Sequence, residues 1–198
     1  MNFDALRRRL SRPPQPVTTN PSAAVLILFA GDRLVFEVRA SGLRTQPGEI
    51  CLPGGRMEPG ESPVQCALRE TQEELGIDSA RISLLGETDY LFHRTGQIIY
   101  PVAGQISPDV LNHLTLNPSE VAQVFTVPLR WLDDHPPMSY RYRLQAIPEA
   151  SMPEQMQQWV QGYENYREGV WWDYEGHLIW GLTARLVQLA LSLTSEQL

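Results

Sequence analysis

Hydrophobic positions appear early in this chain as two short runs that predict neighbouring strands. Residues 23–29 are continuously apolar, and residues 34–38, which are apolar except for Glu37, alternate enough to return as a second strand. Gly31 and Asp32 form a turn signal between the two runs, so we expect a hairpin. Further strands are expected in four runs of apolar or alternating residues, at 82–90, 97–106, 121–127 and 170–174.

A period of 3.6 residues takes over between Pro63 and Leu75 and predicts an amphipathic helix. Ser62 is a favourable N-cap, Gln65 completes a capping box with it, and Gly76 supplies the left-handed residue that ends the helix. The stripe expected to face a core consists of Val64, Ala67, Leu68, Thr71 and Leu75.

Three further segments complete the expected organisation. Residues 1–20 read as a short amphipathic helix followed by a proline-rich tether, and residues 179–193 carry the apolar stripe of a closing helix. Residues 136–168 form a polar insertion that we expect to pack on the domain, with an amphipathic piece over 154–166. Because strands and helices interleave without a βαβ repeat, the sequence predicts one α/β (α+β) domain over 21–198, with a mixed sheet flanked by helices.

Composition narrows the classes of partner. The formal charge of −7 argues against nucleic acid or an anionic membrane, because both attract basic surfaces. No apolar run approaches the roughly 18 to 20 residues of a membrane span, and the N-terminus lacks a signal-peptide run. Cys51 and Cys66 form no disulfide framework, which favours a soluble protein of the reducing cytoplasm. The expected partner is a small molecule, and a homodimer stays open.

Three acidic residues are concentrated on the predicted helix over 63–75. Glu70, Glu73 and Glu74 fan out beside its apolar stripe and lie three and four residues apart, so like charges are neighbours. A divalent cation would turn this repulsion into attraction, and hard carboxylate oxygens suit Mg²⁺ or Mn²⁺. An ordinary solvated acidic face is the alternative for three such glutamates considered alone.

The residues around these glutamates resemble the signature of the Nudix hydrolases. Gly55 is followed after five residues by Glu61, and after seven more by the run from Arg69 to Ile77, which reads RETQEELGI. Thr71 is the departure, since the family usually has a bulky aliphatic residue there. The resemblance implies an α/β/α sandwich and hydrolysis of a nucleoside diphosphate derivative with Mg²⁺ or Mn²⁺.

The preceding loop resembles the subgroup of Nudix hydrolases that cleaves coenzyme A. The positions that match its motif in register are Arg39, Ala40, Arg44, Gly48, Pro53, Gly54 and Gly55. Glu37 stands where that motif has threonine, and Leu52 stands where it has phenylalanine. Arg39 and Arg44, in a passage made pliable by Gly48, are therefore expected to meet the phosphates of the substrate.

The resemblance assigns roles to the remaining candidates. Glu70, Glu73 and Glu74 would hold the metal together with the carbonyl oxygen of Gly54. Glu70, or Glu120 from a loop outside the helix, would orient or deprotonate the attacking water, although Glu120 could equally be an ordinary turn residue. Arg69 is expected to orient the glutamates.

The sequence thus predicts a diphosphatase that splits coenzyme A into 3′,5′-ADP and 4′-phosphopantetheine. The alternatives are a Nudix hydrolase of ADP-ribose, NADH or dinucleoside polyphosphates, and a nucleotide-sensing module that has lost the chemistry.

Overall fold

A computed structural model describes residues 21–93 and 95–194, so the helix and tether expected over 1–20 lie outside the described residues. The main sheet has the order β3-β2-β1-β7-β5, with β4 also paired to β1, β6 to β7 and β8 to β2. Its strands are β1 (Ala23–Ala30), β2 (Arg33–Arg39), β3 (Ile50–Cys51), β4 (Gly54–Arg56), β5 (Ser83–Glu87), β6 (Leu91–Phe92), β7 (Ile98–Ile106) and β8 (Val121–Pro128).

The sheet is mixed, as its sequence predicts. β1 and β2 form the expected antiparallel hairpin, while β1 and β7 run parallel over the whole of β1. Strands buried on both faces read as continuous apolar runs, which is why β1 lacks alternation. The strand expected over 82–90 is shorter than predicted, since β5 ends at Glu87, and the separate short β6 follows at Leu91–Phe92. Both strands pair with β7.

One face of this sheet is covered by α2 (Pro63–Leu75), which has the predicted bounds. Ser62 and Gln65 form the capping box in both directions, and Gly76 adopts the left-handed conformation with φ of 69°. Ala67 and Leu75 are fully buried against β1 and β7, in a core that also includes Val35 of β2. Two 3-10 helices, η1 (Ser79–Arg81) and η2 (Pro108–His113), complete this layer.

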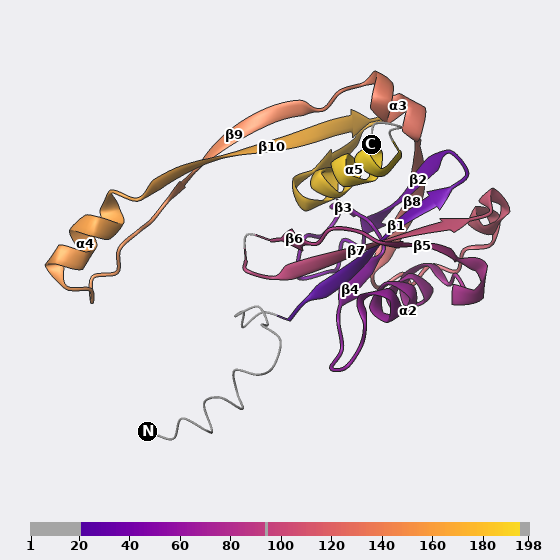
Figure 1. The fold of residues 1–198 in the computed structure, drawn as a ribbon, viewed down its shortest axis with the longest axis horizontal. Helices are drawn as coiled ribbons and strands as arrows, with labels where there is room; N and C mark the ends of the chain where they lie inside the picture. The colour runs from indigo at the N-terminus through magenta and orange to yellow at the C-terminus, as the bar shows by residue number, and fades with distance from the viewer. Residues whose placement is uncertain (1–20, 94, 195–198) are drawn as a thin grey trace, which may run out of the picture.

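The opposite face is covered by α5 (Gly181–Thr194) and the short α3 (Leu129–Asp134). Leu186 and Val187 of α5 pack with Leu34 and Phe36 of β2 in a second core. Helices therefore lie on both sides of the sheet, giving the expected α/β/α sandwich (Figure 1). Among the described residues, none of the helices has the length and apolar character needed to cross a membrane.

A second sheet, β11-β10-β9, corrects three expectations. It contains β9 (Met138–Gln145), β10 (Glu164–Tyr174) and β11 (His177–Trp180), with α4 (Glu154–Gln161) in the connection between β9 and β10. We call residues 138–169 the arm, because β9 and β10 extend away from the sandwich with α4 at the tip (Figure 1).

The expected packing of the insertion on the domain is therefore wrong. No residue over 138–169 is buried, since the strands of the arm satisfy each other's backbone groups without a core beneath them. Residues 164–166 belong to β10 rather than to a helix over 154–166, because Glu164 pairs with Gln145. Likewise, Ile179 lies in β11 and the closing helix begins only at Gly181, which has a positive φ.

Candidate functional site

The three glutamates of α2 differ sharply in exposure. The side chain of Glu73 is 54% exposed and that of Glu70 is 15% exposed. Glu74 is buried, which differs from the expectation that all three lie outside the apolar stripe. Glu74 follows Glu70 by one turn and faces the start of β4, where its Oε2 accepts a hydrogen bond from the Gly54 N–H at 2.9 Å.

Two consecutive glycines let the backbone of β4 approach these carboxylates. Gly54 and Gly55 pair with Val25 and Ala24 of β1. Gly54 has φ of 148°, and a Cβ there would collide with the carbonyl oxygen of Ala24. A Cβ on Gly55 would collide with the carboxyl group of Glu70. Glycine is therefore required at position 54 for steric reasons, and a side chain at position 55 would displace the carboxyl group of Glu70. The Gly54–Gly55 segment lies directly against Glu70 and Glu74.

Arg69 connects most of the acids in this region. Its Nε and Nη2 donate to the two carboxylate oxygens of Glu61 at 2.9 and 3.0 Å, a bidentate pair. Its Nη1 donates to Glu70 Oε1 at 2.9 Å and to Glu73 Oε2 at 3.1 Å. The hydrogen bonds from Arg69 lower the pKa of Glu61 to about 2. Arg69 is thus placed to orient two of the three glutamates and to tie α2 to the loop before it.

Glu120 enters from outside the helix. Asn117 N–H donates to the carbonyl of Glu74 at 2.9 Å, so the turn that ends at Glu120 runs beside the C-terminus of α2. The carbonyl of Glu120 accepts from the N–H of Ala40 at 2.8 Å, which fixes the turn to the end of β2. The charge of Glu120 adds to the forces that raise the pKa of Glu70 and of Glu74. The structure therefore brings this sequence-distant acid toward the α2 glutamates.

Burial dominates the electrostatics of the cluster. Burial raises the pKa of Glu74, although the hydrogen bond from Gly54 lowers it. Burial likewise raises the pKa of Glu70, although the hydrogen bond from Arg69 lowers it. Carboxylates held partly out of water beside one another favour any positive charge that can come between them.

Glu37 belongs to this cluster and was not expected there. It lies in β2 with 1% of its surface exposed. Burial raises its pKa well above the usual range, and repulsion from the charges of Glu74 and Glu120 raises it further. The signal that could have identified it is a charged residue in the middle of an otherwise apolar strand, at the position where the coenzyme A motif has threonine.

The two arginines expected to bind phosphate are placed differently. Arg39 is half-buried at the end of β2, and its charge lowers the pKa of Glu37 and of Glu74. Arg44 is exposed and, among the described residues, forms no ion pair. Gly48, with φ of 73°, closes the loop that contains Arg44 by donating its N–H to the carbonyl of Arg39 at 3.1 Å. The structure therefore joins Arg39, but not Arg44, to the acids.

The donor set fits Mg²⁺ or Mn²⁺. Within 21–93 and 95–194, no three acidic, histidine or cysteine side chains are gathered into a ready-made ion site in this conformation. The chemistry of the cluster nevertheless suits a hard divalent cation, because its donors are carboxylate oxygens and one of them, Glu37 Oε1, is buried without a hydrogen-bond partner. The residues that would hold the ion are those of the family pattern: Glu70, Glu73, Glu74 and the Gly54 carbonyl.

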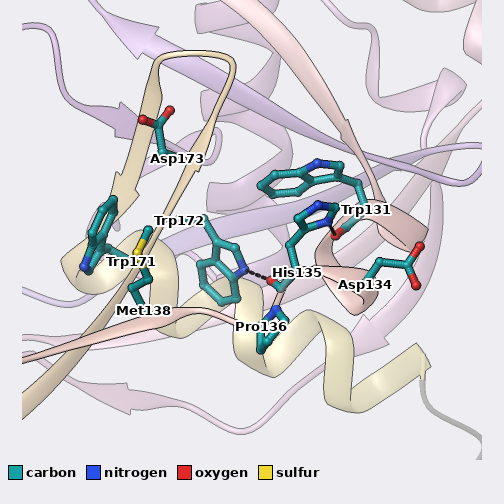
Figure 2. A pocket seen from close by; sticks show the side chains of 8 residues that line it. All are labelled: Trp131, Asp134, His135, Pro136, Met138, Trp171, Trp172 and Asp173. Atoms are coloured by element: carbon teal, nitrogen blue, oxygen red, sulfur yellow. Dashed lines mark hydrogen bonds between the residues drawn. The ribbon is translucent and has the colours of Figure 1, made fainter.

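A cavity of about 260 Å³ lies elsewhere, between α3 and the base of the arm. Figure 2 shows Trp131 stacked on His135, and the indole N–H of Trp172 donating to the His135 carbonyl at 2.8 Å. None of the predicted site residues lines this cavity.

Comparisons with known proteins agree with this geometry. A model of the NUDIX domain matches residues 18–146. An uncharacterized Nudix hydrolase NudL from Photorhabdus laumondii is 33% identical over 192 residues, covering 93% of this chain and 92% of that protein. The mitochondrial coenzyme A diphosphatase NUDT8 of Mus musculus is 29% identical, covering 94% of this chain and 85% of that protein. Nudix hydrolase 3 of Caenorhabditis elegans is 39% identical over 100 residues, which are 50% of this chain and only 42% of that protein.

Proposed function

Because this chain belongs to the Nudix family, we propose that it hydrolyses the diphosphate of coenzyme A or of its acylated or oxidised derivatives. The products would be 3′,5′-ADP and 4′-phosphopantetheine. At the coarser level the chain is a Nudix hydrolase of small molecules that contain a diphosphate. Coenzyme A as the substrate, and the individual residue roles, are our proposal.

The observation that carries the proposal is the meeting of Glu70 and Glu74 with the Gly54–Gly55 loop on one side and Glu120 on the other. Hydrolysis of a diphosphate needs neutralised phosphoryl oxygens and a water held in line with the leaving oxygen. Bound Mg²⁺ or Mn²⁺ would supply the charge neutralisation. The remaining requirements fall to side chains of this chain.

Glu70 or Glu120 would orient the water and accept its proton, because both are carboxylates beside the other acids but come from different elements. The oxygen of water bonds to one phosphorus as the bridging P–O bond breaks, and each half leaves as a phosphate monoester. Arg69 would hold Glu70 and Glu73 in position through its Nη1 hydrogen bonds. Arg39 would bind a phosphoryl oxygen from the end of β2.

Two observations support coenzyme A in particular. The loop from Arg39 to Gly55 matches the motif of the coenzyme A subgroup at seven positions, and a relative that covers most of this chain is named a coenzyme A diphosphatase. Coenzyme A carries a 3′-phosphate in addition to its diphosphate, which gives the exposed Arg44 an anion to meet. Both Cys51 and Cys66 are free thiols, which supports the reducing cytoplasm as the compartment. Assembly as a homodimer stays a prediction.

The second candidate is a Nudix hydrolase of ADP-ribose, NADH or a dinucleoside polyphosphate. Glu37 and Leu52 favour it, because both depart from the coenzyme A motif and both are buried next to the loop that carries Arg39. A nucleotide-sensing module without chemistry is the remaining alternative. The retention of Glu70, Glu73, Glu74 and the two glycines argues against it.

Product analysis of the full chain tests the proposal. Coenzyme A, ADP-ribose, NADH and a diadenosine polyphosphate are incubated separately with Mg²⁺ or Mn²⁺ in ¹⁸O-water, and the products are identified by mass spectrometry. We expect preferred cleavage of coenzyme A, with one ¹⁸O atom in one of the two products. Equal rates across the panel would remove coenzyme A as the substrate, and no turnover of any compound would favour the sensing module.

A further inference from the structure

The carboxyl group of Glu37 is buried on the face of the sheet that α2 covers. Glu37 follows Val35 by two residues in β2, and Val35 packs with Cys66 and Ala67 of α2. Because side chains alternate along a strand, Glu37 points to the same face as Val35. Its register partner on β3 is Cys51, whose thiol donates a long hydrogen bond to Glu37 Oε2 at 3.7 Å.

The second oxygen of this carboxyl group is unsatisfied. Glu37 Oε1 is buried and, among the described residues, has no hydrogen-bond partner. Buried carboxyl oxygens without partners destabilise a fold, and natural structures keep few of them unless they serve a ligand. The thiol of Cys51 is a weak donor and offsets little of this cost.

The surroundings of Glu37 identify the kind of ligand. The acidic neighbours whose charges act on it are Glu74 and Glu120, both members of the cluster around the Gly54–Gly55 loop. The charge of Arg39 also acts on Glu37, and the Nε of Arg39 is itself buried without a hydrogen-bond partner in the described part of the chain. A buried oxygen within reach of the charges of two further carboxylates is a donor for a cation and a poor site for an anion.

We propose that Glu37 is a cation-binding residue that extends the acidic site beyond the glutamates of α2, on the side facing Glu74 and Glu120. Its unsatisfied Oε1 provides a hard oxygen donor for Mg²⁺ or Mn²⁺, directly or through one water. This inference rests on the proposed function in placing the cation at α2. It goes beyond it in assigning a ligand from the central sheet, at a position where the coenzyme A motif has threonine.

Direct Mn²⁺ binding to the full chain provides the test. Free Mn²⁺ is measured by electron paramagnetic resonance in titrations of the wild type, Glu37→Gln and Glu37→Thr, without substrate. Gln keeps the shape and removes the charge, and Thr restores the residue of the motif. Asp109→Asn is the matched control, because Asp109 is an exposed acid paired with Arg81 and lies outside the acidic cluster. Melting temperatures in EDTA and in Mn²⁺ are recorded for each protein.

We expect both Glu37 variants to bind Mn²⁺ roughly ten times more weakly, the range found when residues around a metal ligand are removed. The increase in melting temperature produced by Mn²⁺ should be smaller in both Glu37 variants than in the wild type, because they bind Mn²⁺ more weakly. Asp109→Asn should bind as the wild type does.

Unchanged Mn²⁺ affinity in two folded Glu37 variants would overturn the inference and leave Glu37 as a structural residue. Loss of Mn²⁺ binding in Glu73→Gln but not in either Glu37 variant would also overturn it, while preserving the metal site of α2. Failure of the proposed function gives a different result. The wild type would then bind Mn²⁺ more tightly than the Glu37 variants do, but it would not cleave coenzyme A.

Discussion

Glu73 and Glu74 are neighbours in the sequence but meet opposite environments. Glu73 is exposed and pairs with Arg69 at 3.1 Å, one helical turn away. Glu74 is buried and bonded to the backbone of the Gly54–Gly55 loop. Because an exposed ion pair within a helix contributes about 0.3 to 0.5 kcal/mol, Glu73 is the acid whose loss should separate activity from stability.

We predict that Glu73→Gln lowers turnover by about 100-fold or more, as expected for the loss of one group that stabilises charge in the transition state. Its free energy of unfolding should fall by less than about 0.5 kcal/mol, because only the exposed pair with Arg69 is lost. Steady-state kinetics and urea denaturation measure the two quantities. Asp109→Asn removes a comparable exposed pair and should leave turnover unchanged. A large loss of stability with retained turnover would contradict the role assigned to Glu73.

Thr71 shows how the one departure from the family signature is accommodated. It is fully buried on the core side of α2, and its hydroxyl donates to the carbonyl of Ala67 at 2.7 Å. A hydroxyl bonded to the carbonyl four residues earlier needs no other partner. The substitution therefore affects packing and leaves the acidic face of the helix unchanged.

At the scale of the element, α2 is defined locally at both ends, is packed on the sheet by its apolar side chains, and carries one charged link to the loop before it. Ser62 and Gln65 cap its start, and Gly76 ends it. Arg69 then joins the helix to the preceding loop through Glu61, whose carboxylate is only 12% exposed. The charge of Glu61 therefore contributes to the attachment of α2 to this loop.

This contribution predicts a pH effect on stability. The pKa of Glu61 in the folded protein is about 2, below the ordinary 4.5, so its charged form favours folding. Its contribution is complete above pH 4.5 and is lost as the pH falls from there toward 2. In EDTA, the difference in urea midpoint between the wild type and Glu61→Gln should therefore be larger at pH 6 than at pH 3.

Glu58→Gln serves as the control for this experiment. Glu58 is an exposed acid of the same loop that, among the described residues, forms no ion pair. The difference between the wild type and Glu58→Gln should stay small at both pH values. A pH-independent difference for Glu61→Gln would show that the Arg69 pair does not stabilise the fold through the charge of Glu61.

At the scale of the whole molecule, the arm is the part that does not pack into the α/β/α sandwich. Many of its large apolar side chains are exposed, a concentration that in a soluble protein marks a contact surface or the wall of a binding site. They are Met138, Tyr142, Leu144, Ile147, Met156, Trp159, Tyr163 and Tyr166. None of them contributes to either core of the sandwich.

A shortened arm should therefore leave the sandwich intact. Arg141 and Glu168 are register partners, so Asn-Gly can replace residues 142–167 as a two-residue hairpin turn. We expect the melting temperature to change by less than about 3 °C, because no buried residue is removed. Calorimetry of the full chain and of the variant provides the measurement, and a larger decrease would contradict the independence of the sandwich.

The same variant separates two roles of the arm. Full turnover on the preferred substrate would assign the arm to contacts with a partner, including a second copy of the chain. Lost turnover with a retained melting temperature would make it a wall of the substrate site.

The sequence by itself determined the local features of this protein. The bounds of α2, the β1–β2 hairpin and the placement of Glu70, Glu73 and Glu74 on one helix follow from capping residues, turn residues and periodicity, all of which act over a few residues. The expected Nudix fold followed from the same motif.

Only the tertiary structure decided which distant residues meet. Glu37 on β2 and Glu120 before β8 approach Glu74 because β2 pairs with β8 and α2 lies across the same face of the sheet. Tertiary contacts also determine the extension of the arm, the exposure of Arg44 and the burial of Glu74. Burial and charge coupling depend on contacts between segments far apart in the chain, and no local pattern records those contacts.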